Sequence, residues 1–183
     1  MFIQTETTPN PATLKFIPGR EVLAQGTVQF AVADEAKGKS PLAEHLFAVP
    51  GVTGVFLGRD FISVTKDGDQ DWFQLKPGVL GAIMEHYLSG RPVMVAAPAA
   101  APGASADDDE VTAAIKELIE TRVRPAVAQD GGDIVFENFT DGVVYLQMYG
   151  ACSGCPSSTA TLKAGIENML RHYVPEVIEV RAV

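Results

Sequence analysis

The feature that most constrains the fold is a stretch near the middle of the chain that offers little to bury. Residues 97–106 read APAAAPGASA. The prolines interrupt regular elements, and the small side chains cannot anchor a core. This composition favours a linker over an ordered surface loop. We therefore expect two domains, residues 1–96 and residues 107–183, each close to the smallest size at which a hydrophobic core is independently stable.

Composition and charge exclude several classes of protein. Of the 183 residues, 46% are hydrophobic, which is typical of globular chains. The formal net charge is -9 and no cluster of Lys and Arg is present, which argues against nucleic acid as the main partner. No apolar run approaches the roughly 18 to 20 residues that a membrane span needs. We expect no membrane association.

The N-terminus, MFIQTETTPNP, resembles neither a secretion signal nor an Arg-rich transit peptide. We therefore expect a cytoplasmic protein of a bacterium. The alternative is a protein of the mitochondrial matrix, if the chain is a processed eukaryotic form. In either reducing compartment, a close pair of cysteines is more often metal-binding or catalytic than a structural disulfide.

The first domain reads as a small α+β unit with an antiparallel sheet. Turn chemistry at Thr8–Pro11 separates two short apolar stretches that read as strands, because each proline favours extended geometry in the residue before it. Ser40 and Pro41 are typical of a helix start, and Gly90 of a helix end. The expected elements are strands in residues 1–6 and 12–18, a helix in 40–49, a hairpin in 52–66 and a helix in 76–90.

The second domain is predicted to have the order α-β-β-α-β with a three-stranded sheet. Apolar residues repeat at helical spacing from Val111 and the helix should end before residue 129. Two strands follow, joined by a tight turn at Thr140-Asp141-Gly142. Pro156 opens a second helix, and the last ten residues form a strand. The fold class is α+β, built from two small domains of mixed α/β structure.

Both cysteines of the chain lie in one loop, GACSGCPSS at residues 150–158. Because Pro156 fits the first position of a helix, Cys155 is the expected N-cap. The free N–H groups and positive dipole end of the helix lower a thiol pKa there, so we expect Cys152 and Cys155 to be thiolates. Gly154 would let the backbone fold tightly enough for both sulfurs to face one point. Thiolates suit metal binding and redox chemistry alike.

Three uses of this pair compete. A thiol-disulfide oxidoreductase fits the Cys-x-x-Cys spacing, but Ser-Gly is not the usual intervening pair and the βαβ context is missing. A structural zinc site needs four ligands. His172 would lie about 25 Å from Cys155 along the predicted helix, and His45 and His86 sit on helices of the other domain. None of the three histidines is spaced as a partner.

The third possible use is an iron–sulfur cluster whose ligands come from two chains. Iron–sulfur clusters commonly bind four cysteine thiolates, and one chain supplies two. Two chains would complete the site on a two-fold axis. A cluster held in this way is exposed and easily divided, which suits a cluster that is handed on. A fourth reading, buried thiols without a chemical role, is disfavoured because the loop is rich in serine.

Two stretches resemble a known family, the Nfu proteins. The motif Asp130-Gly131-Gly132-Asp133, the loop from Gly150 to Pro156 and the Ser-rich helix start resemble the NifU C-terminal domain. The opening stretch, with Thr8–Pro11 and Leu14-Lys15-Phe16, resembles the Nfu N-terminal domain. Nfu proteins are iron–sulfur cluster scaffolds and carriers. The resemblance implies that Cys152 and Cys155 bind a [4Fe-4S] cluster that is bridged between two subunits and passed to apo-proteins.

The resemblance also implies a binding and transfer protein and not an enzyme. Its partners would be apo iron–sulfur proteins, upstream cluster-assembly proteins and, in a cluster-dependent homodimer, a second copy of the chain. A carrier is favoured over the scaffold on which a cluster is first built, although that role stays open. Gly131-Gly132 would supply the helix-to-strand turn, or else a docking surface near the loop. The N-terminal domain would serve recognition or regulation.

Overall fold

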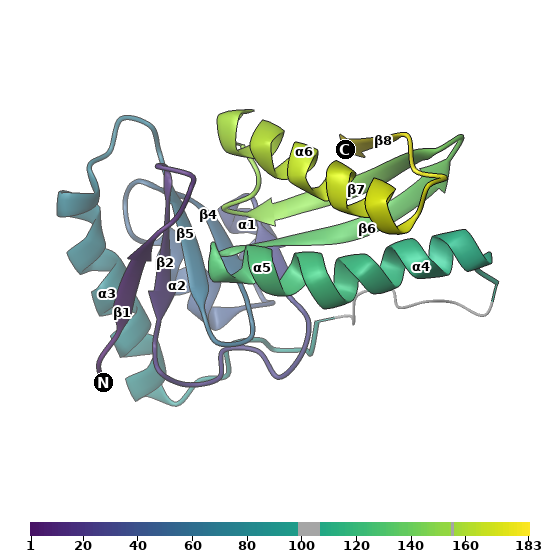
Figure 1. Ribbon diagram of the computed structural model, residues 1–183. Coiled ribbons are helices and arrows are strands. Elements are labelled where there is room, and N and C mark those ends of the chain that lie inside the picture. The colour runs from purple at the N-terminus through teal and green to yellow at the C-terminus, as the bar shows by residue number, and fades with distance from the viewer. Residues whose placement is uncertain (99–106, 155) are drawn as a thin grey trace.

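A computed structural model describes residues 1–98, 107–154 and 156–183, and it contains two bodies of secondary structure that lie side by side (Figure 1). Each has a hydrophobic core of its own. The predicted linker, apart from its first two residues, lies outside the described residues. The domain boundaries therefore stay a prediction, while the α+β class with two mixed domains is confirmed.

The N-terminal body is a five-stranded sheet in the order β1-β2-β5-β4-β3, with every neighbouring pair antiparallel. The two strands and the hairpin expected from the sequence are all present. The short strand β3 and the short helix α1 have no clear sequence signal and were not predicted. The elements are β1 (Gln4–Thr7), β2 (Thr13–Ile17), β3 (Val28–Phe30), α1 (Ala33–Ala36), α2 (Pro41–Phe47), β4 (Val52–Leu57), β5 (Ile62–Lys66) and α3 (Trp72–Ser89).

Local capping sets the helix limits in this body. Ser40 caps α2, because its hydroxyl accepts a hydrogen bond from the Ala43 N–H at 3.1 Å. Gly90 ends α3 in the left-handed conformation, with φ of 68°. The prediction that α3 begins at residue 76 is wrong: it begins at Trp72, because the Asp71 carboxylate caps the Phe73 N–H at 2.8 Å.

The two faces of this sheet have different roles. One face packs against α2 and α3, and its side chains form the core, for example Phe16, Ile62 and Val64. The other face, which we call the outer face, carries the alternate residues of the same strands. Those residues are buried although they belong to neither core: Thr13, Lys15, Phe56 and Ser63. Something else must therefore cover the outer face.

The C-terminal body follows the predicted order α-β-β-α-β. Its sheet has the order β6-β7-β8, in which β7 is antiparallel to β6 and parallel to β8. Asp141 and Gly142 both have positive φ, of 53° and 77°, as a tight hairpin turn requires. The elements are α4 (Glu110–Leu118), η1 (Ile119–Val123), α5 (Arg124–Gln129), β6 (Gly132–Thr140), β7 (Val143–Gly150), α6 (Pro156–Tyr173) and β8 (Glu179–Ala182).

The first helix of this body contains a π-helical turn, Ile119–Val123, between α4 and α5. In it the Arg124 N–H donates to the carbonyl of Ile119, five residues earlier. Pro125 follows at once, and since it has no N–H it cannot donate to the carbonyl four residues before it. The proline gives a physical reason why the regular pattern is interrupted at this point.

The long helices α4–α5 and α6 lie across the same face of the C-terminal sheet (Figure 1). Apolar residues of the helices, such as Ile115 and Leu170, pack on apolar residues of the strands, such as Ile134 and Leu146. The β6–β7 hairpin has its tight turn at one end, and its other end approaches β4 and β5 of the N-terminal body. Within the described residues, no helix is long and apolar enough to span a membrane.

Candidate functional site

The cysteine-containing loop follows β7 at the end of the sheet that faces the N-terminal body. Its backbone turns through Gly150 and Gly154, whose φ values are 62° and 79°. The Ser153 N–H and hydroxyl both donate to the Gly150 carbonyl, at 3.2 and 3.0 Å. Gly154 therefore adopts a backbone conformation that other residues rarely take, in keeping with the tight fold expected of it.

The Cys152 side chain points into the protein. It is only 6% exposed and packs with the C-terminal core. Its sulfur lies so close to Gly132 that a Cβ atom at that position would overlap it. Burial, and then the negative charges of Asp130 and Asp133, raise the pKa of the Cys152 thiol to about 12. The prediction that Cys152 is a thiolate is therefore wrong for this arrangement.

The second cysteine, Cys155, lies outside the described residues. The expectation for its pKa stays a prediction. Helix α6 does begin at Pro156, as the sequence indicated, so the loop leads directly into a helix start. The Thr159 hydroxyl donates to the Cys152 carbonyl at 3.1 Å and thereby ties the first turn of this helix back to the loop.

The segment before β6 packs beside the loop. Gly131 has φ of 79° and makes the sharp helix-to-strand turn that the sequence predicted. Its carbonyl accepts a hydrogen bond from the Ala151 N–H at 3.2 Å, and a second one from the Ser63 hydroxyl at 2.6 Å. The second bond comes from the outer face of the N-terminal sheet. The expected turn is thus confirmed at Gly131, while the alternative docking surface stays a prediction.

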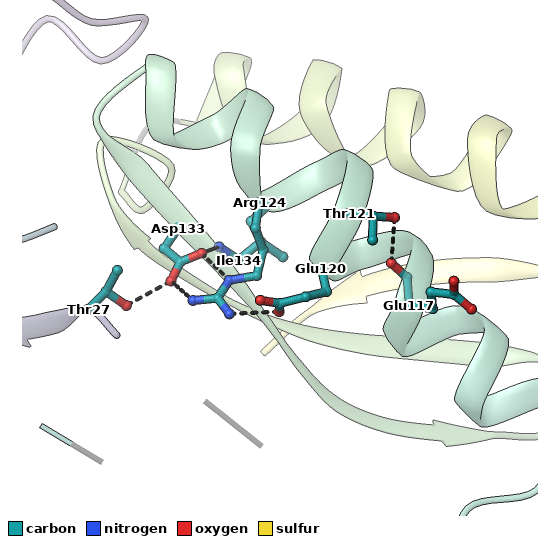
Figure 2. Close-up of polar contacts among 7 residues, drawn as sticks. All are labelled: Thr27, Glu117, Glu120, Thr121, Arg124, Asp133 and Ile134. Atoms are coloured by element: carbon teal, nitrogen blue, oxygen red, sulfur yellow. Dashed lines mark hydrogen bonds and ion pairs between the residues drawn. The ribbon is translucent and has the colours of Figure 1, made fainter. Parts of the chain in front are cut away.

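An ion pair next to this turn fixes the start of β6 (Figure 2). The Asp133 carboxylate is 3% exposed and accepts hydrogen bonds from the Arg124 guanidinium at 2.8 and 2.9 Å. It also accepts from the Thr27 hydroxyl at 2.7 Å, which crosses to the N-terminal body. Glu120 pairs with Arg124 at 2.7 Å, and hydrogen bonding to the two carboxylates raises the pKa of Arg124.

Among the described residues, five side chains of the N-terminal body hydrogen-bond to the two segments around Cys152. Two of these bonds flank the cysteine directly. The Asn10 amide donates to the Ser153 carbonyl at 3.0 Å, and the Gln29 side-chain carbonyl accepts from the Gly150 N–H at 2.7 Å. The other three bonds reach the stretch from the end of α5 to the start of β6: Lys15 to the Gln129 carbonyl at 3.0 Å, Ser63 to Gly131 and Thr27 to Asp133.

Sequence reasoning missed all five of these side chains. Asn10 was read only as turn chemistry, and its Oδ1 atom does accept from the Ala12 N–H at 3.0 Å. The available signal was Lys15 and Ser63, which are polar side chains inside strands whose neighbours are apolar. Such a pattern indicates a sheet face turned away from the core. It does not indicate what covers that face.

The histidines stay away from the loop, as expected. His45 and His86 lie on α2 and α3 with their rings 6.0 Å apart, and His172 lies at the far end of α6. Among the described residues, no group of three or more His, Cys, Asp or Glu side chains is placed to hold a metal ion.

Comparison with known proteins gives a consistent result for both bodies. Residues 3–90 match the family model described as "Scaffold protein Nfu/NifU N terminal". Residues 115–181 match the model described as "NifU-like domain". The two matches fall on either side of the segment that was predicted to be a linker, and the second one includes the cysteine loop.

Two full-length relatives are similar over nearly the whole chain. A human protein, "NFU1 iron-sulfur cluster scaffold homolog, mitochondrial", is 50% identical over 100% of this chain and 72% of its own length. "NifU-like protein 4, mitochondrial" from Arabidopsis thaliana is 52% identical over 97% of this chain and 64% of its own length. A solution structure of a NifU-like protein from Saccharomyces cerevisiae is 30% identical over 52% of this chain and 85% of that one, with a TM-score of 0.47.

Proposed function

Since this chain belongs to the Nfu family of NifU-like proteins, we propose that it binds a [4Fe-4S] cluster between two copies of itself and passes the cluster to apo-proteins. Cys152 and Cys155 of each copy would supply the four thiolates. The protein would act as a carrier that binds and transfers, without turning over a substrate as an enzyme does. The cluster is thus the cargo of this protein.

The observation that carries the proposal is the ligand count. The chain has two cysteines, both in one loop, and the described residues offer no further group of metal ligands near it. A four-thiolate shell therefore needs two chains. The loop also leads into the N-terminus of an 18-residue helix, whose dipole favours negative charge nearby, as a cluster ligated by thiolates carries.

The residues of the loop suit such a cargo, with one condition. Gly132 leaves room for the Cys152 sulfur where any other residue would place a Cβ atom. Ligation needs the thiolate, however, and burial raises the pKa of this thiol to about 12. Because its side chain is only 6% exposed, Cys152 would have to turn outward to share a cluster with a second copy of the chain. The arrangement in Figure 1 is best read as the resting form of a carrier.

The same observation weakens the thiol-disulfide alternative. An attacking thiol is effective when its pKa lies near the ambient pH, and a buried, protonated Cys152 does not meet that requirement. A zinc-stabilised module is disfavoured because His45, His86 and His172 all lie away from the loop. The Cys-x-x-Cys spacing remains the one feature in favour of the oxidoreductase.

We also propose partners and a compartment. The recipients would be apo iron–sulfur proteins, and the donors would be upstream cluster-assembly proteins. Relatives that are named mitochondrial support the matrix as the compartment. The bacterial cytoplasm expected from the sequence stays a proposal without such support.

Anaerobic reconstitution with iron and sulfide, followed by metal analysis and size-exclusion chromatography, tests the proposal. We expect about four irons and four sulfides per dimer, and a dimer that forms only with the cluster. Cys152→Ala and Cys155→Ala should each abolish iron binding, whereas His172→Ala should bind iron like the wild type. A monomer that holds one zinc, or iron retained by Cys152→Ala, would show that the proposal is wrong.

A further inference from the structure

We propose that the outer face of the N-terminal sheet is a docking surface for the cysteine loop, and that this docking and cluster binding exclude each other. The proposal rests on the function proposed above and adds a form of regulation to it. In the docked form, the N-terminal body holds Cys152 inward. In the carrier form, the loop is free to face a second copy of the chain.

Two anchors on either side of Cys152 hold the loop. Gln29 accepts from the Gly150 N–H, two residues before the cysteine, and Asn10 donates to the Ser153 carbonyl, one residue after it. Both bonds are to backbone atoms, so they fix the path of the loop itself. Because Cys152 lies between them, the two bonds hold the backbone in the path that places its sulfur against Gly132.

The adjoining segment is held in the same way. The Lys15 ammonium donates to the Gln129 carbonyl, and the Ser63 hydroxyl donates to the Gly131 carbonyl. These bonds hold Gly131 and Gly132 against the loop, and Gly132 is the residue on which the Cys152 sulfur rests. The N-terminal body therefore fixes both the loop and the surface beneath it.

The outer face is specialised for this contact. Lys15 is 8% exposed and Ser63 is 1% exposed, which is rare for polar side chains that belong to no core. The Lys15 ammonium lies 4.9 Å from the centre of the Phe61 ring, so its charge is stabilised at a buried place. Phe56 packs against Gly150, where a Cβ atom would come within 2.8 Å of the ring. A side chain at residue 150 would separate the two bodies.

The same contact has the character of a reversible one. Its side-chain hydrogen bonds end mostly on backbone atoms, and pockets lined by residues of both bodies flank it on two sides. One lies around Gln29, Phe56 and Ser153, and the other around Thr27 and Arg124. Interfaces that are polar and incompletely packed allow the domains on either side to move apart. The N-terminal body can thus separate from the loop without unfolding either core.

Alkylation of Cys152 by iodoacetamide measures the release directly and needs no iron. The background variant Cys155→Ser leaves Cys152 as the only thiol of the chain. Asn10→Asp keeps the Oδ1 atom that caps Ala12 but replaces the donor to Ser153 with an oxygen. Removal of one such bond should raise the alkylation rate about fivefold, because the rate follows the fraction of molecules with an open loop.

Matched control variants distinguish loss of docking from a general loss of folding. Gln29→Leu removes the acceptor for Gly150 and should also raise the rate about fivefold, whereas Gln29→Glu keeps an acceptor and should leave it close to the wild type. Asn138→Asp makes the same chemical change as Asn10→Asp on an exposed strand of the hairpin, and should change nothing. Circular dichroism checks that each variant is folded.

Equal alkylation rates in the Cys155→Ser background with and without Asn10→Asp or Gln29→Leu would overturn the docking proposal. A rate in the Cys155→Ser background equal to that of the same chain unfolded in urea would overturn it as well. Reconstitution with iron is then a separate readout, which should be faster in both variants with intact cysteines. If no chain binds iron but the alkylation pattern holds, the docking stands and the carrier function falls. If iron binds but the alkylation rates are equal, the carrier function stands and the docking proposal falls.

Discussion

Replacing Asp133 with asparagine should destabilise the C-terminal body by about 2–3 kcal/mol. The carboxylate accepts hydrogen bonds on both oxygens: one contacts Arg124 Nε and the Ile134 N–H, and the other contacts Arg124 Nη2 and the Thr27 hydroxyl (Figure 2). An asparagine keeps the first oxygen. It places an NH₂ group at the second position, where one donor would face another at Arg124.

The size of this destabilisation depends on the partners that Arg124 still has in the variant. Removal of one partner of a buried ion pair costs about 3–5 kcal/mol, and a single hydrogen bond to a charged group contributes about 1.5–3 kcal/mol. The Arg124 side chain is 16% exposed and still pairs with Glu120 in the variant. Water and Glu120 therefore compensate in part, and the expected cost of about 2–3 kcal/mol lies at or just below the bottom of the first range.

Urea unfolding measures this cost if the two bodies are observed separately. Trp72, the only tryptophan, reports on the N-terminal body, and circular dichroism reports on both. With a slope of about 1 kcal/mol per M urea, the midpoint of the C-terminal transition should fall by about 2 M or more. Asp130→Asn, an exposed carboxylate three residues earlier, is the control. A loss below about 0.5 kcal/mol in Asp133→Asn would refute the reasoning.

Two further predictions concern the loop and the N-terminal core. Gly132→Ala would place a Cβ atom over the Cys152 sulfur and 2.9 Å from the Tyr149 carbonyl oxygen. It should therefore lower the free energy of unfolding by about 1–3 kcal/mol in thermal unfolding and also speed alkylation of Cys152. An unchanged stability together with an unchanged alkylation rate would contradict the packing described. Burial, and then the positive charges of His45 and Arg91, lower the pKa of His86. Unfolded His86 takes up its proton at about pH 6.5 and folded His86 only at lower pH, so the stability of the N-terminal body should fall as the pH drops below about 6.5. His86→Leu should remove this part of the loss in unfolding followed by Trp72 fluorescence. The same pH profile in His86→Leu and the wild type would show that His86 is not its source.

Local signals predicted most of the secondary structure. Ser40 caps a helix, Asp141-Gly142 makes a hairpin turn and Pro156 begins a helix, each through the conformational preference of one or two residues. The missed start of α3 has a cause of the same kind. Asp71 is a good capping residue, and Pro77 lies inside the helix and not at its first position.

The surroundings of Cys152 could not be predicted in this way. The bond between Asn10 and Ser153 joins residues 143 positions apart, and no local pattern indicates that they meet. The thiolate prediction failed for the same reason, because it considered the helix dipole and not burial. Desolvation depends on which atoms exclude water, here Gly132 and the C-terminal core, and this is a property of the assembled fold.

The π-helical turn decides the rotational phase of the first C-terminal helix. Ile115, Ile119, Val123 and Val127 all face the core at intervals of four residues, yet an α-helix completes a turn in about 3.6 residues. In a regular helix each interval would overshoot by about 40°, and the last of these residues would face away from the first by about 120°. The wider turn absorbs that drift. In evolutionary terms it equals one inserted residue, and its deletion would leave the helix unbroken but rotate α4 by about 100° against α5. The alignment of Ile115 with the core, while Arg124 faces Asp133, thus depends on the count of residues as much as on their identity.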